Sequence, residues 1–267
     1  MDEAQIIKSI NMNPPIIKMI KNPTDEMKLL AVSKNGLVLE YIKEPTRQME
    51  EIAINNNPRA IKFVSNPTED MMIKAIESGW NILEYIKNPT DKVMALAIEQ
   101  AGWAIQYVKE PSEALQLSAV RKNYDAIKYI KEPYESVQEE AVRKSYDALK
   151  YIASPSPIVE RIAIKNNESA IHFVKELDQN KILEFLKVNI LVIKHVGSKL
   201  TQDEVEDVLK QVLADENVEE KYVRDFLNCN MIDRNSQTMP IDKILFIYRY
   251  GSQKAKKIAV DERLKML

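Results

Sequence analysis

Residues 23–44 read PTDEMKLLAVSKNGLVLEYIKE, and variants of this 22-residue stretch follow one another through most of the chain. Its first residue recurs at a constant spacing, as Pro23, Pro45, Pro67, Pro89, Pro111, Pro133 and Pro155. When each repeat is numbered from its proline as position 0, position 8 is alanine, position 9 is valine or isoleucine, and position 18 is tyrosine or phenylalanine. Self-similarity at a short fixed period is typical of repeat architectures.

Each repeat is predicted to form two short helices. A threonine or serine follows most of the prolines and can accept a hydrogen bond in the first turn of a helix of about ten residues. Residues such as Asn35 and Gly36 then favour a helix end, and a second helix with apolar positions 15, 16 and 19 ends before the next proline. We expect the alanine to allow close helix approach and the aromatic residue to fill the space between layers.

Helices of this length are not stable alone in water. Each must therefore bury its apolar side against the repeats before and after it, which is the principle of a solenoid. The predicted fold class is all-α: an α-solenoid of short two-helix repeats, 22 residues each, with a divergent helical C-terminal cap.

Two domains are predicted. Residues 1–198 hold a partial first unit, seven regular units and a degenerate last unit, in which Leu177 replaces the proline and His195 replaces the aromatic residue. Residues 199–267 form a helical C-terminal cap or small domain, because Thr201 and Glu204 have the spacing of a capping box and longer, irregular helices follow. The polar stretch between Asn228 and Pro240 is predicted to be a loop.

Composition excludes several classes of protein. The 267 residues carry 38 basic and 40 acidic side chains, so the formal net charge of −2 excludes a strongly basic nucleic-acid protein. The single cysteine, Cys229, excludes an intramolecular disulfide framework and a cysteine-rich zinc site. No phosphate-binding loop, dinucleotide fingerprint or metalloprotease motif is present. The chain is therefore predicted to be no enzyme, with no catalytic residue, metal or cofactor.

The N-terminus lacks the pattern of a signal peptide, and the apolar runs are too short for a membrane-spanning helix. These features predict a cytoplasmic protein with no membrane partner.

Residues 31–42, Ala-Val-Ser-Lys-Asn-Gly-Leu-Val-Leu-Glu-Tyr-Ile, resemble the core of a short helical-repeat family of unknown function from bacterial, bacteriophage and large-DNA-virus proteins. The resemblance covers roughly residues 10–175; the later units depart from it, with Asn123-Tyr124 and Ser145-Tyr146 in place of Asn-Gly. It implies a helical fold and a binding role, and it assigns no catalytic residue. The phage members imply a viral or mobile-element origin.

Four aromatic residues lie near the start of the predicted second helices, outside the repeating core positions. They are Trp80, Trp103, Tyr124 and Tyr146. A row of tryptophan and tyrosine on one edge of a solenoid has the composition of an interface hot spot. The alternative interpretation is packing between repeats near the turn.

Basic residues end the predicted first helices of two later repeats, as Arg121, Lys122, Arg143 and Lys144. They predict a basic ridge for partner binding, although cations at a helix C-terminus also suit the helix dipole. Farther along, residues 231–267 are basic. That segment has the charge to contact nucleic acid or an acidic protein surface, or it is a solvated helix face.

His172 and His195 are the only histidines and lie 23 residues apart. No motif connects them to a mechanism, so both are interpreted as structural. An enzyme is the third hypothesis, and base excision is its least implausible version. Asp125 and Asp147, beside Tyr124 and Tyr146, are the only candidate acids for it.

The leading hypothesis is a non-enzymatic solenoid that binds a protein partner, in the form of a phage- or mobile-element-encoded inhibitor of a host defence protein. The alternative is a nucleic-acid-binding helical-repeat protein that uses a basic and aromatic edge. The oligomeric state does not follow from the sequence, and the C-terminal helices are a candidate surface for self-association.

Overall fold

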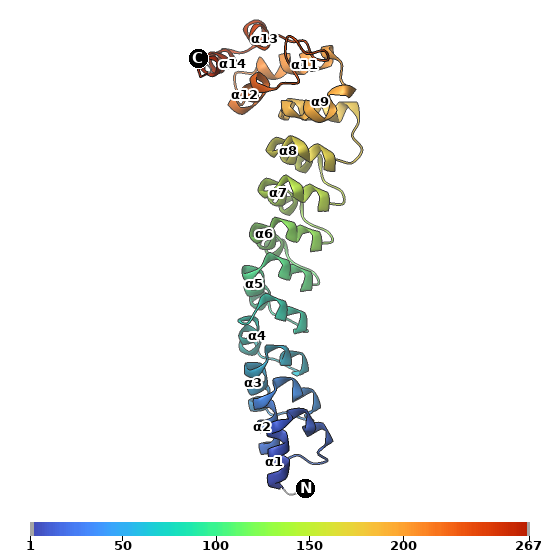
Figure 1. Ribbon diagram of the computed structural model, residues 1–267, viewed down its shortest axis with the longest axis vertical. Coiled ribbons are helices and arrows are strands. Elements are labelled where there is room, and N and C mark those ends of the chain that lie inside the picture. The colour runs from blue at the N-terminus through green and yellow to red at the C-terminus, as the bar shows by residue number, and fades with distance from the viewer. Residues whose placement is uncertain (1–2, 266–267) are drawn as a thin grey trace. The chain divides into compact units, whose positions relative to one another are not determined.

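The computed structural model describes residues 3–265, and every regular element within them is a helix (Figure 1). The α-helices are α1 (Glu3–Met12), α2 (Asp25–Lys34), α3 (Arg47–Asn56), α4 (Glu69–Ile76), α5 (Asp91–Gln100), α6 (Glu113–Lys122), α7 (Glu135–Lys144), α8 (Pro157–Asn166), α9 (Gln179–Val188), α10 (Ile193–Val196), α11 (Gln202–Leu213), α12 (Glu220–Asn228), α13 (Lys243–Tyr250) and α14 (Gln253–Leu264).

Ten 3₁₀ helices, labelled η, alternate with the early α-helices in residues 3–265. They are η1 (Pro14–Met19), η2 (Gly36–Tyr41), η3 (Pro58–Phe63), η4 (Trp80–Tyr85), η5 (Gly102–Tyr107), η6 (Tyr124–Tyr129), η7 (Tyr146–Tyr151), η8 (Glu168–Phe173), η9 (Ile190–Val192) and η10 (Gly197–Lys199). Each regular repeat is thus one α-helix followed by one 3₁₀ helix, and the predicted all-α solenoid is confirmed.

Local capping starts the first helix of six of the seven regular repeats. The Thr24 side chain accepts a hydrogen bond from the Met27 N–H, and its counterparts Thr46, Thr68, Thr90, Ser112 and Ser156 cap their helices in the same way. At the other end, the Asn35 N–H donates to the Ala31 carbonyl. The threonine or serine that follows the proline is therefore an N-cap in these six repeats, as the sequence predicts, whereas Tyr134 stands at this position in the seventh.

The second element of each repeat is a 3₁₀ helix, a distinction that the sequence analysis did not make. Gly36 and Leu39 are buried in η2, and Ile42, which follows η2, is buried as well. Residues three apart lie in line along a 3₁₀ helix, since it has three residues per turn. Apolar residues at positions 16 and 19 can therefore both face the core, even though six residues is long for this helix type.

The alanine and β-branched positions form the core. Every alanine at position 8 is fully buried, and the valine or isoleucine at position 9 is at most 2% exposed. Within residues 3–137, successive α-helices such as α2 and α3, or α5 and α6, pack against one another. The alanine therefore stands where neighbouring helices approach closely, as predicted.

The prediction that the aromatic residue at position 18 fills the space between layers holds only in part, because Tyr107 and Phe173 stack on a ring of the preceding repeat whereas three other rings are exposed. Tyr41 is 42% exposed, Tyr129 40% and Tyr151 36%, and the other rings at this position are half-buried. The residue at position 18 is the last of its 3₁₀ helix, and the exposure of its ring varies from repeat to repeat.

The chain divides into two compact units, Met1–Val137 and Gln138–Leu267, and the division falls within α7. The second unit holds the last repeats and the irregular C-terminal helices. Thr201 and Glu204 form the predicted capping box at the start of α11. The segment between Asn228 and Pro240 lies between α12 and α13 without helix, as predicted.

The C-terminal helices are joined to the last repeat by a buried tyrosine. The Tyr222 hydroxyl in α12 donates a hydrogen bond to the Leu186 carbonyl in α9 at 2.9 Å. In addition, α12 and α13 both pack against α14.

Within residues 3–265, none of the helices is both long enough and apolar enough to span a lipid bilayer.

Candidate interaction surface

Aromatic rings at position 18, two of them exposed and three half-buried, recur once per repeat along the 3₁₀ helices of the first unit. They are Tyr41, Phe63, Tyr85, Tyr107 and Tyr129. Each ring belongs to the last residue of its 3₁₀ helix, so the solenoid period sets the spacing of the row.

Cationic side chains lie over several of these rings. The Lys62 ammonium is 4.6 Å from the Phe63 ring centroid and 5.9 Å from that of Tyr85 in the next repeat. Lys128 is 5.0 Å from the Tyr129 ring centroid. A cation at these distances is attracted by the negative face of an aromatic ring. The row is therefore mixed in character, with aromatic faces and positive charge side by side.

Of the predicted aromatic residues, Trp80 takes part in packing between repeats. Its half-buried ring stacks on Tyr107 of the next repeat, with centroids 6.2 Å apart and planes 29° apart. Tyr146 stacks in the same way on Phe173, at 6.3 Å, within the second unit. Tyr124 is half-buried in the first unit. These placements support the packing interpretation for Trp80 and Tyr146.

Trp103 differs from the other three, because it stands one residue later in its repeat and is 36% exposed. Its indole Nε1–H donates to Asp125 Oδ1 at 2.8 Å, and Lys128 Nζ donates to Asp125 Oδ2 at 3.0 Å. Trp103 is thus connected through Asp125 and Lys128 to the ring of Tyr129. We call the five rings at position 18 together with Trp103 the 3₁₀ edge.

Asp125 is held as a carboxylate within the 3₁₀ edge. Burial raises the pKa of its carboxyl group, but the hydrogen bonds from Trp103 and Lys128 outweigh burial and hold that pKa below its ordinary value. A carboxylate with this pKa is a poor proton donor near neutral pH, so its evident role is to orient Trp103.

The predicted basic residues lie at helix C-termini in two different units. Arg121 and Lys122 are exposed at the end of α6, in the first unit, and Arg143 and Lys144 are exposed at the end of α7, in the second. Arg143 also forms an ion pair with Glu139 at 2.8 Å. Cations at a helix C-terminus interact favourably with the helix dipole. This interaction within its own helix is a sufficient reason for the position of each basic pair.

Amide side chains connect successive repeats, a role that the sequence analysis missed. Asn56 Nδ2 donates to the Ser33 carbonyl at 2.9 Å, while its Oδ1 accepts the Gly36 N–H at 2.7 Å. Other repeats use Gln100, Asn123, Asn166 and Asn189 at position 11 or 12 in related ways. The recurrence of Asn or Gln at these positions was the available signal. These amide hydrogen bonds therefore help to hold neighbouring repeats together.

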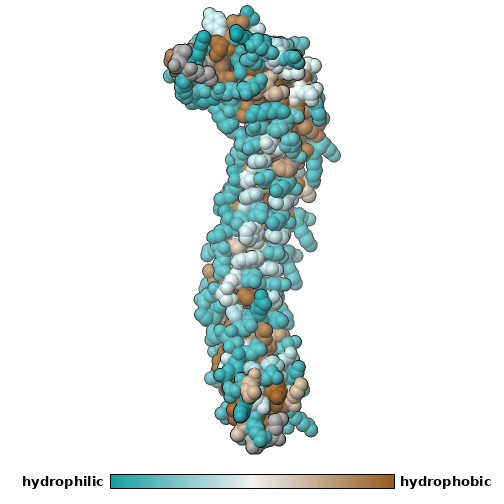
Figure 2. Space-filling view, viewed as in Figure 1, coloured by the Kyte–Doolittle hydropathy of each residue, from teal (hydrophilic) through white to brown (hydrophobic). Residues whose placement is uncertain are grey.

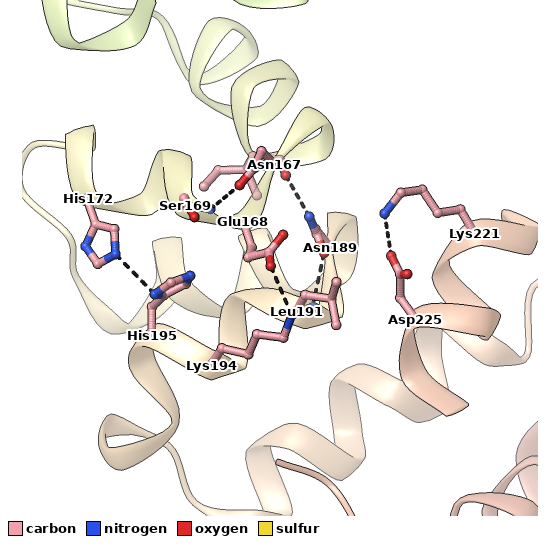
Figure 3. A network of polar contacts seen from close by, with 11 residues as sticks. Asn167, Glu168, Ser169, His172, Asn189, Leu191, Lys194, His195, Lys221 and Asp225 are labelled. Atoms are coloured by element: carbon pink, nitrogen blue, oxygen red, sulfur yellow. Dashed lines mark hydrogen bonds and ion pairs between the residues drawn. The ribbon is translucent and has the colours of Figure 1, made fainter. Parts of the chain in front are cut away.

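The two histidines meet in the second unit (Figure 3). His172 Nε2 and His195 Nδ1 are 3.1 Å apart, with ring centroids at 4.6 Å and planes at 80°. Beside them, Lys194 and Glu168 form an ion pair at 3.0 Å. A separation of about one repeat was the sequence signal for this contact. Among residues 3–265, no cluster of three or more His, Cys, Asp and Glu side chains has the arrangement of a metal site.

The histidine pair predicts a pH-dependent stability. Burial, His172 and Lys194 lower the pKa of His195, and Glu168 opposes them more weakly. The unfolded chain therefore binds the proton at a higher pH than the folded chain does, and stability falls as the pH falls through about 6.5. Between pH 7.5 and 5.5, the thermal midpoint of the wild type should fall more than that of His195→Gln. An equal fall in both proteins would contradict this assignment.

No family model, curated protein or solved structure matches this chain. The resemblance to the short helical-repeat family stays a prediction.

Proposed function

We propose that the chain is a non-enzymatic solenoid that binds a protein partner through the 3₁₀ edge of its first unit. The observation that carries this proposal is the regular row of partly or fully exposed aromatic rings, one per repeat, in which Tyr41 and Tyr129 are at least 40% exposed. Aromatic residues are enriched in protein interfaces, where they bury a large area at a small entropic cost.

The physical setting of the row supports this function. The view in Figure 2 shows a mostly hydrophilic surface along the repeats. The rings of the 3₁₀ edge are carried on helices that pack into a regular framework, so a partner would meet a preorganised surface. Asp125, held by Trp103 and Lys128, supports a binding role over an acid–base role.

The alternative is a nucleic-acid-binding edge. The observation that favours it is the placement of cations such as Lys62 and Lys128 over the rings. Stacked bases and phosphates could use the same two groups. Binding of this kind would weaken steeply with salt, since cations displace counterions from phosphates.

The test is an affinity pulldown from a bacterial lysate with three baits. They are the wild type, an edge variant Tyr41→Ala/Trp103→Ala/Tyr129→Ala, and the control Tyr134→Ala. Tyr134 is 51% exposed and is not part of the 3₁₀ edge. We expect a protein that survives nuclease treatment to be retained by the wild type and the control. Its recovery with the edge variant should fall by at least about tenfold. Unchanged melting curves would show that all three baits are folded.

Equal recovery with the edge variant would contradict binding through the 3₁₀ edge. Retention that nuclease abolishes, and that falls steeply between low and moderate salt, would favour the nucleic-acid alternative. The identification of the partner as a host defence protein rests on the resemblance alone, and this experiment does not depend on it.

A further inference from the structure

The last two described α-helices expose apolar side chains. Tyr248 in α13 is 73% exposed, and Val260 and Leu264 in α14 are 59% and 64% exposed. In α13 the opposite side is apolar as well, because Phe246 is buried in the interior. A helix that is apolar on two sides is normally covered on both. Figure 2 shows hydrophobic surface among the C-terminal helices.

Two of these side chains, Tyr248 and Val260, border a groove within the second unit. A hollow of about 740 Å³ lies between the end of α12, the segment before α13, and helices α13 and α14. A second hollow of about 310 Å³, with almost entirely apolar walls, shares Ile244, Tyr248, Ala259 and Arg263 with the first. The two hollows are therefore parts of one groove, and each falls within the size range of ligand sites.

The acidic residues of the groove are occupied by contacts inside the protein. Glu262 forms an ion pair with Arg224 and accepts a hydrogen bond from Asn228. Asp242 caps α13 by accepting the Leu245 N–H at 3.0 Å, and Asp233 accepts the Asn235 N–H at 2.9 Å.

The basic residues of the groove form fewer contacts with charged groups of the protein. Within residues 3–265, Arg234 and Arg263 have no ion pair. Lys256 lies 5.9 Å over the Tyr248 ring, at the apolar end of the groove. Of the charged residues that line the groove and form no ion pair within residues 3–265, four are basic (Arg234, Lys243, Lys256 and Arg263) and two are acidic (Asp233 and Asp242). The charge left without an opposite charge is therefore net positive, in a segment that holds eight basic and four acidic residues between positions 231 and 267.

We propose that this groove binds an amphipathic helix of a partner protein, with an apolar face and acidic flanks. The apolar face would lie against Tyr248 and Val260, as in other helix-in-groove interfaces. Its acidic flanks would pair with Arg234, Lys256 and Arg263. The groove shares no residue with the 3₁₀ edge, so a result that contradicts one of the two proposals leaves the other unaffected.

The probes are three fluorescein-labelled peptides of about 15 residues, long enough to form a helix. The first has leucine at i, i+3, i+4 and i+7 with glutamate around it, and the second has lysine in place of each glutamate. The third has the composition of the first with its leucines spread around the helix. Measured by fluorescence polarisation against the full chain, the first should bind at least about tenfold more tightly than the others.

Matched variants locate the binding. Val260→Asp and Arg263→Glu should each lower the affinity for the acidic peptide by about tenfold, because each substitution places negative charge in the groove. Lys257→Glu makes the same charge change at an exposed residue of α14 that does not line the groove, and it should bind like the wild type. All these side chains are exposed or nearly so, and melting curves should confirm folding.

Two results would overturn the proposal. The first is equal affinity for the three peptides, or an effect of Lys257→Glu as large as that of Arg263→Glu. The second is a dimer of the chain, seen by light scattering and abolished by Val260→Asp, which would assign the groove to a second copy.

Discussion

Replacing Phe226 with alanine is expected to lower the free energy of unfolding of the C-terminal helices by about 3–5 kcal/mol. Phe226 is completely buried in α12 and is the largest of the fully buried side chains in residues 3–265. Its ring meets that of Phe246 in α13 edge to face, with centroids 6.2 Å apart and planes at 64°. Alanine would leave a cavity, and it would remove the contact that joins α12 to α13.

The loss should be local. In a repeat protein each unit is stabilised mainly by its neighbours, so hydrogen exchange should accelerate in α12, α13 and α14, while residues 3–137 keep their protection. Chemical denaturation gives the magnitude. The control is Tyr248→Ala, which removes an aromatic ring from α13 at a residue that is 73% exposed. It should change stability by no more than about 0.5 kcal/mol.

A similar loss of unfolding free energy in Phe226→Ala and Tyr248→Ala would show that the buried Phe226 ring stabilises these helices no more than an exposed ring does. The two variants also bear on the peptide experiment. Tyr248 lines the groove, whereas Phe226 supports the groove from inside the core.

The second large effect is expected from Gly102→Ala, which should lower stability by about 1–3 kcal/mol through overpacking. A Cβ atom built on Gly102 would stand 2.2 Å from the carbonyl oxygen of Ala119, in the backbone of α6. The Gly102 N–H also donates to Asn123 Oδ1 at 2.9 Å. The next repeat would have to move away, which would stretch this hydrogen bond and separate the buried helices.

The same substitution at Gly197 is the control for Gly102→Ala. There the nearest atom to an added Cβ is Ile193 Cγ1 at 3.5 Å, an ordinary contact, and the backbone is helical. Because alanine favours a helix over glycine, Gly197→Ala should leave stability unchanged or raise it by up to about 1 kcal/mol. Thermal and urea unfolding of both variants would check the opposite signs. Equal midpoints would contradict the close approach of α6 to Gly102.

Part of the candidate surface could be predicted from the sequence and part could not. The exposure of Trp103 agrees with its selection as an interface residue, since it lies outside the repeating core positions. Trp80 was selected on the same grounds, yet it stacks on Tyr107 of the next repeat. The two tryptophans stand one residue apart in register, which the sequence shows, but only the packed repeats reveal which of the two positions the next repeat covers.

By itself the sequence determined the period, the capped helix starts and the buried alanine at position 8. These features depend on spacing along the chain: Thr24 caps a helix because Met27 lies three residues later, and local geometry sets that distance. Only the tertiary structure decided the side of each 3₁₀ helix that the next repeat covers. The tertiary structure also exposes Tyr41, brings His172 to His195, and leaves Tyr248 and Val260 of the irregular C-terminal helices uncovered in the second unit. The physical reason is that exposure depends on neighbours distant in sequence, whereas capping and helix period depend on residues within one or two turns.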